Sequence, residues 1–411
     1  MRYILPILLW YLVPMAACCH TVEVCKQCNI NTLQAGITAA QPGDTILLKP
    51  GNYASVNTQV NKPLTIIGIN YPVLDGEEKD EVLVITANRV TLQGLDVRNS
   101  KRGSMKDYAG IRIYKSTDIR IDNCRLTNTF FGIYLSDSRR ISVSNVHSKG
   151  ANYGMSDTGN GIHLWKCDSV LIENNYLEGH RDGIYLEFAK NSFIRNNLAE
   201  KNFRYGLHFM FSDSDTYTHN TFRLNGTGVA VMYSKGMHMF YNHFENNWGD
   251  ASYGLLLKDM SGGIITNNTF ANNTIGITME GSNHMRMEKN DFLNNGYGLK
   301  VMANCIEDTF RYNNFSGNTF DAATNGELQQ NIFSANYWDK YEGYDLNRDG
   351  YGDIPFNPVS LYSVMVEQMP YAVMLMRSFT VDLINRAEKN MPGIVPSTFV
   401  DNLPVMKMIK R

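Results

Sequence analysis

The chain has no excess of basic charge, since 38 Lys and Arg face 40 Asp and Glu for a formal net charge of -2. Proteins that bind nucleic acid carry a positive field that attracts phosphates, so this balance argues against a nucleic-acid partner. Charged residues are also few, at 19% against 43% apolar residues, which excludes a disordered chain and allows a large core. After residue 19 no stretch reaches 18 apolar residues without a charge, so we expect no membrane span in the mature protein.

The first 19 residues are typical of an export signal. One charge, Arg2, precedes an apolar run over residues 4–13, and the small residues Ala16 and Ala17 follow. A run of about ten apolar residues is too short to cross a bilayer as a helix. We therefore predict a signal peptide over residues 1–19. The residues around Cys18 also loosely resemble a bacterial lipobox, in which Cys18 would carry a lipid anchor.

Cysteine is scarce, at seven residues, and only one close pair follows the export signal. In an oxidising compartment Cys25 and Cys28 could close a small disulfide, bind a soft metal or cap the N-terminal end of the rod. A single C-x-x-C lacks the second pair that a tetrahedral zinc site needs, so a disulfide or redox pair is favoured. The isolated Cys124, Cys167 and Cys305 are expected to be buried.

The chain is rich in one repeat. From residue 110 onward the pattern Gly-apolar-x-apolar occurs nine times, with successive glycines 22, 29, 22, 23, 22, 26, 22 and 22 residues apart. Alternating apolar residues, turn residues and the lack of helical periodicity indicate three short strands in each unit. A leucine-rich horseshoe of similar period would need a helix in each unit. The sequence therefore predicts an all-β fold, a right-handed parallel β-helix of about 22-residue coils over residues 20–335.

A recurring Asn supports this fold. In six units an Asn stands fourteen residues after the glycine, and stacked coils would place these side chains roughly 4.8 Å apart. We predict that their amides pair from coil to coil as an internal ladder of Asn175, Asn197, Asn220, Asn242, Asn268 and Asn290.

The register of the repeat separates inward from outward positions. The first and third residues after each glycine are apolar and face the core, so the second and fourth face outward. In the central coils the outward positions hold soft and aromatic side chains: His163, Trp165, Tyr185, His208, Met210 and Met232. The pairs Met237/Met239 and Met285/Met287 instead stand where other coils have Ile or Val, so we predict that they lie in the core.

Thioether sulfur together with imidazole nitrogen is a donor set that Cu(I) favours. We therefore predict a copper site at His163, His208, Met210 and Met232. Two inserts, which enter before Gly110 and Gly161, could fold over the same face and add Met105 and Met155. The alternative is that a loop or a partner protein covers an ordinary apolar patch.

An enzyme is the second possibility, because many parallel β-helices act on polysaccharides. Inverting glycosidases need two carboxyl groups about 6.5–9.5 Å apart. Glu187 and Glu280 have no acidic residue at the equivalent outward position of the coils before and after them. We therefore predict no enzyme, and keep a secreted carbohydrate-binding or carbohydrate-cleaving protein acting through Glu187 or Asp182 as the alternative.

After residue 335 the repeat stops and a loop rich in oxygen ligands follows, over residues 336–358. Positions 1, 3, 5 and 9 of a calcium loop are occupied by Asp345, Asn347, Asp349 and Asp353, with Gly350 at the sharp turn. The twelfth position is Phe356, so the usual bidentate Glu is missing. The segment could hold calcium or form a calcium-free turn held by side-chain-to-backbone hydrogen bonds.

The remaining residues, 359–411, are predicted to form a Met-rich helical extension. Residues 361–369 and 371–390 fit two helices, with Pro370 at the start of the second. Met-rich apolar helices often serve as adaptable docking surfaces, and the alternative is a plain cap for the rod. The residues predicted to dock a partner are Met365, Met369, Met374, Met376 and Phe379.

The C-terminal segment resembles the NosD family, periplasmic proteins required for the copper sites of nitrous oxide reductase. The resemblance rests on N-Y-W-D at 336–339, G-Y-D at 343–345 and D-G-Y-G-D-I-P at 349–355, followed by Ser363, Glu367, Arg377, Ser378 and Asp382. Phe356 stands where the family is expected to have Tyr.

The resemblance implies a non-enzymatic role in the periplasm. A NosD protein would accept Cu(I) transiently from a membrane-anchored, NosL-like chaperone and pass it to nitrous oxide reductase. It would do so while docked through its C-terminal helices on the ABC transporter formed by NosF and NosY. A metal-free scaffold of the same transporter complex remains the alternative, because Met-rich surfaces suit both soft metals and partner helices.

Overall fold

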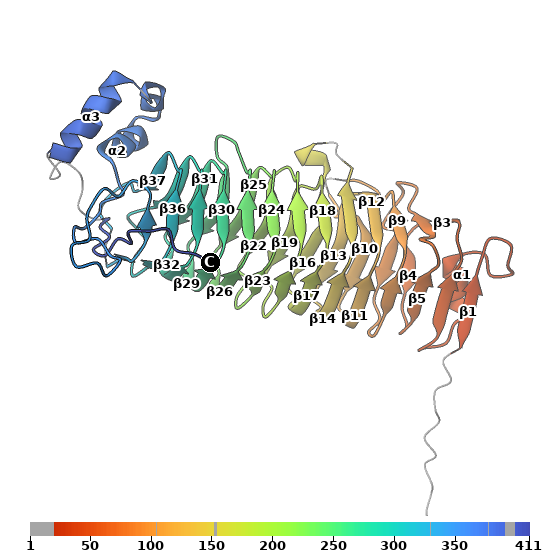
Figure 1. Cartoon of the computed structure of the whole chain (residues 1–411). Helices are drawn as coiled ribbons and strands as arrows, with labels where there is room; N and C mark the ends of the chain where they lie inside the picture. Colours follow the sequence, from red (N-terminus) through yellow and green to blue (C-terminus); the bar gives the residue numbers. More distant parts are fainter. Residues whose placement is uncertain (1–19, 104, 152–153, 329, 377, 391–398) are drawn as a thin grey trace, which may run out of the picture.

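The computed structural model describes residues 20–411 except 104, 152–153, 329, 377 and 391–398 (Figure 1). The predicted signal peptide, residues 1–19, and the lipid-anchor candidate Cys18 lie outside the described residues. The chain winds into a rod with three parallel sheets, in which neighbouring strands come from successive coils. This architecture confirms the predicted right-handed parallel β-helix.

Sheet A has 14 strands, and in the repeat region it holds the strand that follows the Gly-apolar-x-apolar strand of each coil. Its strands are β1 (Thr21–Val24), β2 (Thr45–Leu48), β5 (Thr65–Gly68), β8 (Thr91–Gln93), β11 (Thr117–Asp122), β14 (Arg139–Ser144), β17 (Asp168–Glu173), β20 (Phe193–Arg195), β23 (Thr216–Thr218), β26 (Lys235–Phe240), β29 (Ser261–Thr266), β32 (Asn283–Glu288), β35 (Thr309–Arg311) and β38 (Ile332–Ser334).

Sheet B has 13 short strands, and in the repeat region it holds the last strand of each coil. Its strands are β3 (Asn52–Ala54), β6 (Val73–Asp75), β9 (Asp96–Arg98), β12 (Arg125–Thr129), β15 (His147–Gly150), β18 (Tyr176–Glu178), β21 (Leu198–Glu200), β24 (Thr221–Arg223), β27 (His243–Glu245), β30 (Thr269–Ala271), β33 (Asp291–Leu293), β36 (Asn314–Ser316) and β39 (Tyr337–Trp338).

Sheet C has 12 strands and carries the Gly-apolar-x-apolar pattern. Its strands are β4 (Thr58–Val60), β7 (Leu83–Ile85), β10 (Ala109–Tyr114), β13 (Phe131–Ser136), β16 (Ile162–Trp165), β19 (Asp182–Glu187), β22 (Tyr205–Met210), β25 (Thr227–Met232), β28 (Tyr253–Lys258), β31 (Ile275–Glu280), β34 (Tyr297–Val301) and β37 (Phe320–Ala323).

The core lies inside the coils, where alternate residues of all three sheets meet. On β10, for example, Ile111 and Ile113 are fully buried, whereas Tyr114 is exposed. Met237, Met239, Met285 and Met287 are also fully buried, which confirms the prediction that they are core residues. Beneath sheet B an aromatic column runs toward the C-terminal end through Phe222, Phe244, Phe270, Phe292, Phe315 and Trp338.

The predicted Asn ladder is present. Asn197 Nδ2, for instance, donates to Asn220 Oδ1 on the next coil at 2.9 Å and to the carbonyl of Ile172 at 2.9 Å. A second ladder, which we did not predict, runs at the turn between sheets B and C. Its members each follow a member of the longer first ladder by five residues, so the same period would have revealed it: Asn202, Asn225, Asn247, Asn273, Asn295 and Asn318.

The two ends of the rod are closed by different segments. At the N-terminal end α1 (Leu33–Ala39) packs against the first strands and buries Leu33 and Ile37. At the other end the strands extend three residues past the predicted limit, to Trp338, and residues 399–411 return along the rod. In this returning tail Asp401 forms isolated β-bridges with both Phe333 and Phe356. We predicted a helical extension to the end of the chain, but residues 399–411 are not helical.

The described helices near the C-terminus are α2 (Leu361–Gln368), the 3-10 helix η2 (Pro370–Leu375) and α3 (Phe379–Asn390). The second predicted helix is thus divided. Ser378 begins the new helix, because its Oγ accepts from Val381 N at 3.4 Å and its carbonyl accepts from Asp382 N at 3.2 Å. None of the helices in the described part of the chain is long and apolar enough to span a membrane.

Candidate functional site

The outer face of sheet C holds the predicted soft-ligand residues on four successive strands. His163 on β16 lies beside Tyr185 on β19, and Tyr185 lies beside His208 on β22. His208 faces Ala230 and Met210 faces Met232 on β25. The register inferred from the glycine repeat is therefore confirmed: these residues occupy equivalent positions on successive strands of sheet C.

The aromatic and imidazole rings at the second position after each glycine contact one another from coil to coil. The ring centroids of Tyr134 and His163 are 4.3 Å apart and those of His163 and Tyr185 are 4.7 Å apart, both in stacked geometry. Tyr185 meets His208 edge-on at 4.8 Å. Because Tyr185 lies between them, the two imidazoles stand two coils apart and do not face a common point.

His163 is a buried, neutral imidazole. It is 7% exposed, and its Nδ1 lies 2.9 Å from Asn160 Nδ2. Burial, and to a smaller extent the charge of Arg181, lowers the pKa of His163 to about 3. The ring is therefore uncharged at neutral pH, and its Nδ1 lone pair accepts the hydrogen bond from Asn160 Nδ2.

His208 lies beneath an ion pair. Arg204 Nε donates to Asp182 Oδ1 at 2.8 Å and its Nη2 contacts the other oxygen. Burial opposes the charge on Asp182, but hydrogen bonds from Arg204 and His208 hold the pKa of this carboxyl below its usual range. His208 Nδ1 is 3.6 Å from Asp182 Oδ2 and 3.3 Å from Arg204 Nη2.

The other ring nitrogen of His208 is unpartnered. Nε2 is buried and has no hydrogen-bond partner within the part of the chain that the structure describes. In the tautomer whose Nδ1–H faces Asp182, Nε2 presents a free lone pair. Metal-binding histidines are commonly held in this way, with a carboxylate behind one nitrogen and the metal on the other.

Two thioethers share the outer face of sheet C with His208. Met210 follows it by two residues on the same side of β22, roughly 7 Å along the strand, and Met232 pairs with Met210 on the next coil, roughly 4.8 Å from it. Both are half-buried, and the hydroxyl of Tyr185 donates to Met210 Sδ at 3.9 Å. Met has three rotatable bonds, so both sulfurs can move toward the imidazole. We call His208, Met210 and Met232 the soft-ligand group.

The inserts do not bring their methionines to this group. Met105 is fully exposed, and Met155, in the 3-10 helix η1 (Met155–Asp157), is 55% exposed. Both inserts join sheet C at the start of a strand, whereas Met210 and Met232 end theirs, roughly 17 Å away along an extended strand. The insert with Met105 also enters four coils before β22.

The carboxylates that an enzyme would need are also far apart. Asp182 is the first residue and Glu187 the last residue of β19, so they are separated by roughly 17 Å of extended chain. That spacing exceeds the roughly 6.5–9.5 Å of an inverting glycosidase. Glu187 instead accepts from the Tyr185 hydroxyl at 3.3 Å.

In the loop after the rod, the oxygen ligands predicted for calcium accept hydrogen bonds from the loop itself. The two oxygens of Asp345 accept from Asp349 N at 3.1 Å and Gly350 N at 2.9 Å. Asn347 Oδ1 also accepts from Asp349 N, and Asp353 Oδ2 accepts from Leu346 N. This geometry supports the calcium-free turn, and calcium binding stays a prediction.

The C-terminal helices attach to the rod on one side and leave apolar residues uncovered on another. Tyr362 and Val366 pack with Phe320 of β37, and Lys300 Nζ pairs with Glu367 at 2.6 Å. Of the residues predicted to dock a partner, Met365 is half-buried and four are exposed: Met369, Met374, Met376 and Phe379.

At the N-terminal end of the rod Cys25 and Cys28 form a disulfide bond. Glu23 lies beside it. The three isolated cysteines are buried, as predicted.

Solved structures share the fold. The A-module of a mannuronan C-5 epimerase from Azotobacter vinelandii matches with a TM-score of 0.52 and 12% identity, over 72% of this chain and 94% of that one. A family 28 exopolygalacturonase from Yersinia enterocolitica matches with a TM-score of 0.52 and 10% identity, over 76% and 78%. At this level of identity the likeness concerns the β-helix alone.

Sequence relatives point to one family. A family model described as periplasmic copper-binding protein (NosD) matches residues 143–343. Two relatives are named probable ABC transporter binding protein NosD. The one from Stutzerimonas stutzeri is 26% identical over 88% of this chain and 86% of its own length. The one from Pseudomonas aeruginosa is 27% identical over 88% of each chain. The rod, the C-terminal signature and these relatives agree with one another, and together they support the resemblance of this chain to the NosD family.

Proposed function

We propose that this protein is a non-enzymatic copper-handling factor of the periplasm, which accepts Cu(I) and helps to deliver it to nitrous oxide reductase. The observation that carries the proposal is the soft-ligand group, in which two thioethers share a face with an imidazole nitrogen that has no hydrogen-bond partner among the described residues. Thioether and imidazole suit Cu(I), whereas harder ions prefer oxygen ligands. The description of the family as copper-binding supports the same cargo.

The arrangement suits transient binding. Imidazole and thioether are weaker ligands for Cu(I) than thiolate, and the two sulfurs are on flexible side chains, so a partner with thiolate ligands can take the ion. His163 lies two coils away on the same face and is neutral, so it is a candidate for a second Cu(I)-binding position. Met105 and Met155 on the exposed inserts are candidates for the first contact with a NosL-like chaperone.

We further propose that the C-terminal helices dock on an ABC transporter of the NosF/NosY type. Met374 and Phe379 are 83% and 74% exposed, although such side chains are usually buried. An uncovered apolar surface of this kind is typical of a site for another protein. The relatives' name, ABC transporter binding protein, supports this assignment.

Anaerobic titration with Cu(I) against a competing chelator tests the metal proposal. The variant His208→Gln/Met210→Leu/Met232→Leu keeps side-chain size but removes the soft donors, and we expect its affinity to fall at least about tenfold, or 1.4 kcal/mol. Met302→Leu is the matched control. Met302 is also half-buried, and like Met210 and Met232 it stands four residues after a glycine of the repeat. Equal binding by the wild type and the triple variant would overturn the assignment.

A metal-free scaffold is the competing function, since the apolar helices alone could explain partner binding. An experiment in cells that measures the copper content of the reductase distinguishes the two functions. If the triple variant still gives fully copper-loaded reductase, the scaffold is supported. If Met374→Glu/Phe379→Glu abolishes co-purification with the transporter while Cu(I) binding persists, docking and metal binding are separate activities of one chain.

A further inference from the structure

A second group of soft ligands lies at the N-terminal end of the rod, away from sheet C's soft-ligand group. The segment Cys25-Lys26-Gln27-Cys28 follows β1 and precedes α1, at the end opposite to the C-terminal helices (Figure 1). Cys28 N donates to the carbonyl of Cys25 at 3.1 Å, and Cys25 N donates to Ile30 O at 3.1 Å. These backbone bonds close the turn independently of the disulfide, so the turn can persist when the disulfide is reduced.

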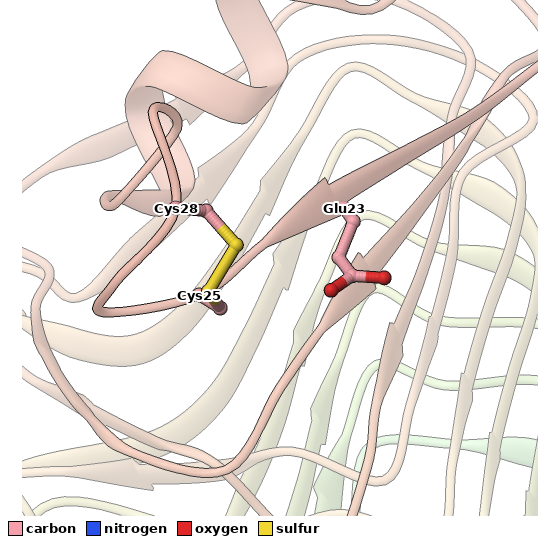
Figure 2. A group of neighbouring side chains, drawn as sticks. All are labelled: Glu23, Cys25 and Cys28. Carbon is pink, nitrogen blue, oxygen red and sulfur yellow. A yellow bond between two sulfur atoms is a disulfide. The ribbon is translucent and has the colours of Figure 1, made fainter.

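A carboxylate completes the group. Glu23 extends from β1 beside the disulfide, and its oxygen and the two sulfurs lie within 4.8 Å of one another (Figure 2). In the described part of the chain no other three His, Cys, Asp or Glu side chains come this close. Both cysteines are partly exposed and Glu23 is exposed, so a reductant and a metal ion can reach all three.

The other thiols behave differently. Cys124, Cys167 and Cys305 are buried, and burial raises the pKa of Cys124 to about 12, that of Cys167 to about 12 and that of Cys305 to about 11. Buried thiols of this kind stay protonated and out of reach of reagents. Redox and metal chemistry of cysteine in the described chain is therefore confined to the turn at Cys25 and Cys28.

We propose that the Cys25–Cys28 disulfide is a redox-gated site for Cu(I). A dithiol reductant breaks the S–S bond and becomes a disulfide itself, and its two electrons and two protons produce two thiols on this chain. Cu(I) then binds both sulfurs and displaces two protons. In the reverse direction a disulfide oxidant takes two electrons from the two thiolates and two protons from water and becomes two thiols, the Cys25–Cys28 bond reforms, and Cu(I) is released.

The ligand set decides the metal. Two thiolates and one carboxylate fall short of the four protein ligands of a structural zinc site, whereas soft thiolates in a site of low coordination number select Cu(I). Glu23 is held by Lys49 at 3.5 Å, so we assign it a positioning role at the edge of the site. The inference does not depend on the soft-ligand group of sheet C.

The test uses the His208→Gln/Met210→Leu/Met232→Leu background, so that binding on sheet C does not contribute. The protein is reduced with a phosphine that is then removed without oxygen, and oxidised and reduced samples are titrated with Cu(I) against a chelator. We expect one additional equivalent in the reduced sample, with a near-ultraviolet thiolate-to-copper absorption. A thiol reagent should find two more reactive groups after reduction in the native state.

Cys25→Ser/Cys28→Ser should lose the additional equivalent, whereas Cys305→Ala should keep it. Alkylation of the reduced wild type before copper is added provides a second route, should the double variant fold poorly. Equal copper binding by the oxidised and reduced samples would overturn the proposal, as would additional binding that survives in the double variant. Preferential binding of Zn²⁺ by the reduced turn would overturn the choice of metal.

Discussion

At the N-terminal end of the rod a short helix covers the first coil, whereas at the C-terminal end the chain returns after an excursion and adds a single carboxylate to the last coil. Leu33 and Ile37 of α1 close the first end by apolar packing. At the second end Asp401, which is fully buried, accepts hydrogen bonds from Asn336 N at 3.0 Å, Asn336 Nδ2 at 2.9 Å and Trp338 Nε1 at 3.1 Å.

The difference follows from the direction of the Asn ladders. Each amide oxygen accepts from the preceding coil and each amide NH₂ donates to the following coil, as between Asn313 and Asn336 at 3.0 Å. The last coil therefore needs an acceptor, and an ionised carboxylate only accepts. The second ladder ends in the same way, because Asn318 Nδ2 donates to Asp321 at 3.2 Å. The first ladder begins at Asn175, whose Oδ1 accepts from Val146 N, so it does not extend to the first coils, where α1 packs.

The largest effect should come from breaking the C-terminal closure. Asp401→Ala leaves several buried donors without an acceptor, and at roughly 1–3 kcal/mol for each unsatisfied group we expect a loss of about 3–5 kcal/mol after partial relaxation. Asp401→Asn keeps one oxygen and should cost less. Denaturant unfolding of both variants measures the difference, and a loss below about 1 kcal/mol for the Ala variant would contradict this account of the cap.

A buried carboxyl in the middle of the rod sharpens the contrast with Asp401. Asp215 accepts from Ser192 N at 2.7 Å and from the Tyr217 hydroxyl at 3.4 Å. Burial raises the pKa of Asp215 to about 7. Because its folded pKa lies above the unfolded value of about 3.9, its contribution to stability is complete below pH ~4 and is lost as the pH rises through 7.

The change Asp215→Asn should remove this pH dependence. We expect the stability of the wild type, relative to the variant, to fall by up to a few kcal/mol between pH 4.5 and 8, at roughly 1.4 kcal/mol per unit of pKa difference. Urea unfolding of both proteins across this range gives the measurement. Parallel curves for the two proteins would show that Asp215 titrates normally.

The N-terminal closure should be less costly to weaken. Leu33→Ala creates a cavity under α1 and should cost about 2–4 kcal/mol. Reduction of Cys25–Cys28 should cost less, about 1–2 kcal/mol, because the disulfide closes a loop of only four residues. Unfolding of oxidised and reduced wild type, with Cys25→Ser/Cys28→Ser as the control, separates the two. A larger loss on reduction than for Leu33→Ala would mean that the disulfide, and not the helix, closes this end.

The smallest effect is expected from calcium. The oxygens of Asp345 already accept from the amides of Asp349 and Gly350, so an added ion must displace hydrogen bonds of the loop. We expect millimolar calcium to raise Tm of the wild type by no more than about 1 °C, relative to Asp345→Asn/Asp349→Asn. A clear rise confined to the wild type would establish the calcium loop instead.

How much could be predicted depends on whether a feature repeats. The coil period and the apolar alternation placed Met210 above Met232 and put Met237 and Met239 in the core, as the structure confirms. The second Asn ladder follows the same period, and a count of Asn residues would have found it. The division of the second C-terminal helix at Ser378 was missed because its apolar residues continue on both sides of the break.

The sequence by itself determined the fold, the register of each coil and the residues on each face, because these depend on alternation along single strands and on one repeated length. Only the tertiary structure decided that Tyr185 separates His163 from His208, that Arg204 and Asp182 lie beside His208, whose Nε2 has no hydrogen-bond partner among the residues described, and that Asp401 completes a ladder. These contacts join residues from different coils or distant segments, and no local pattern encodes which side chain meets which.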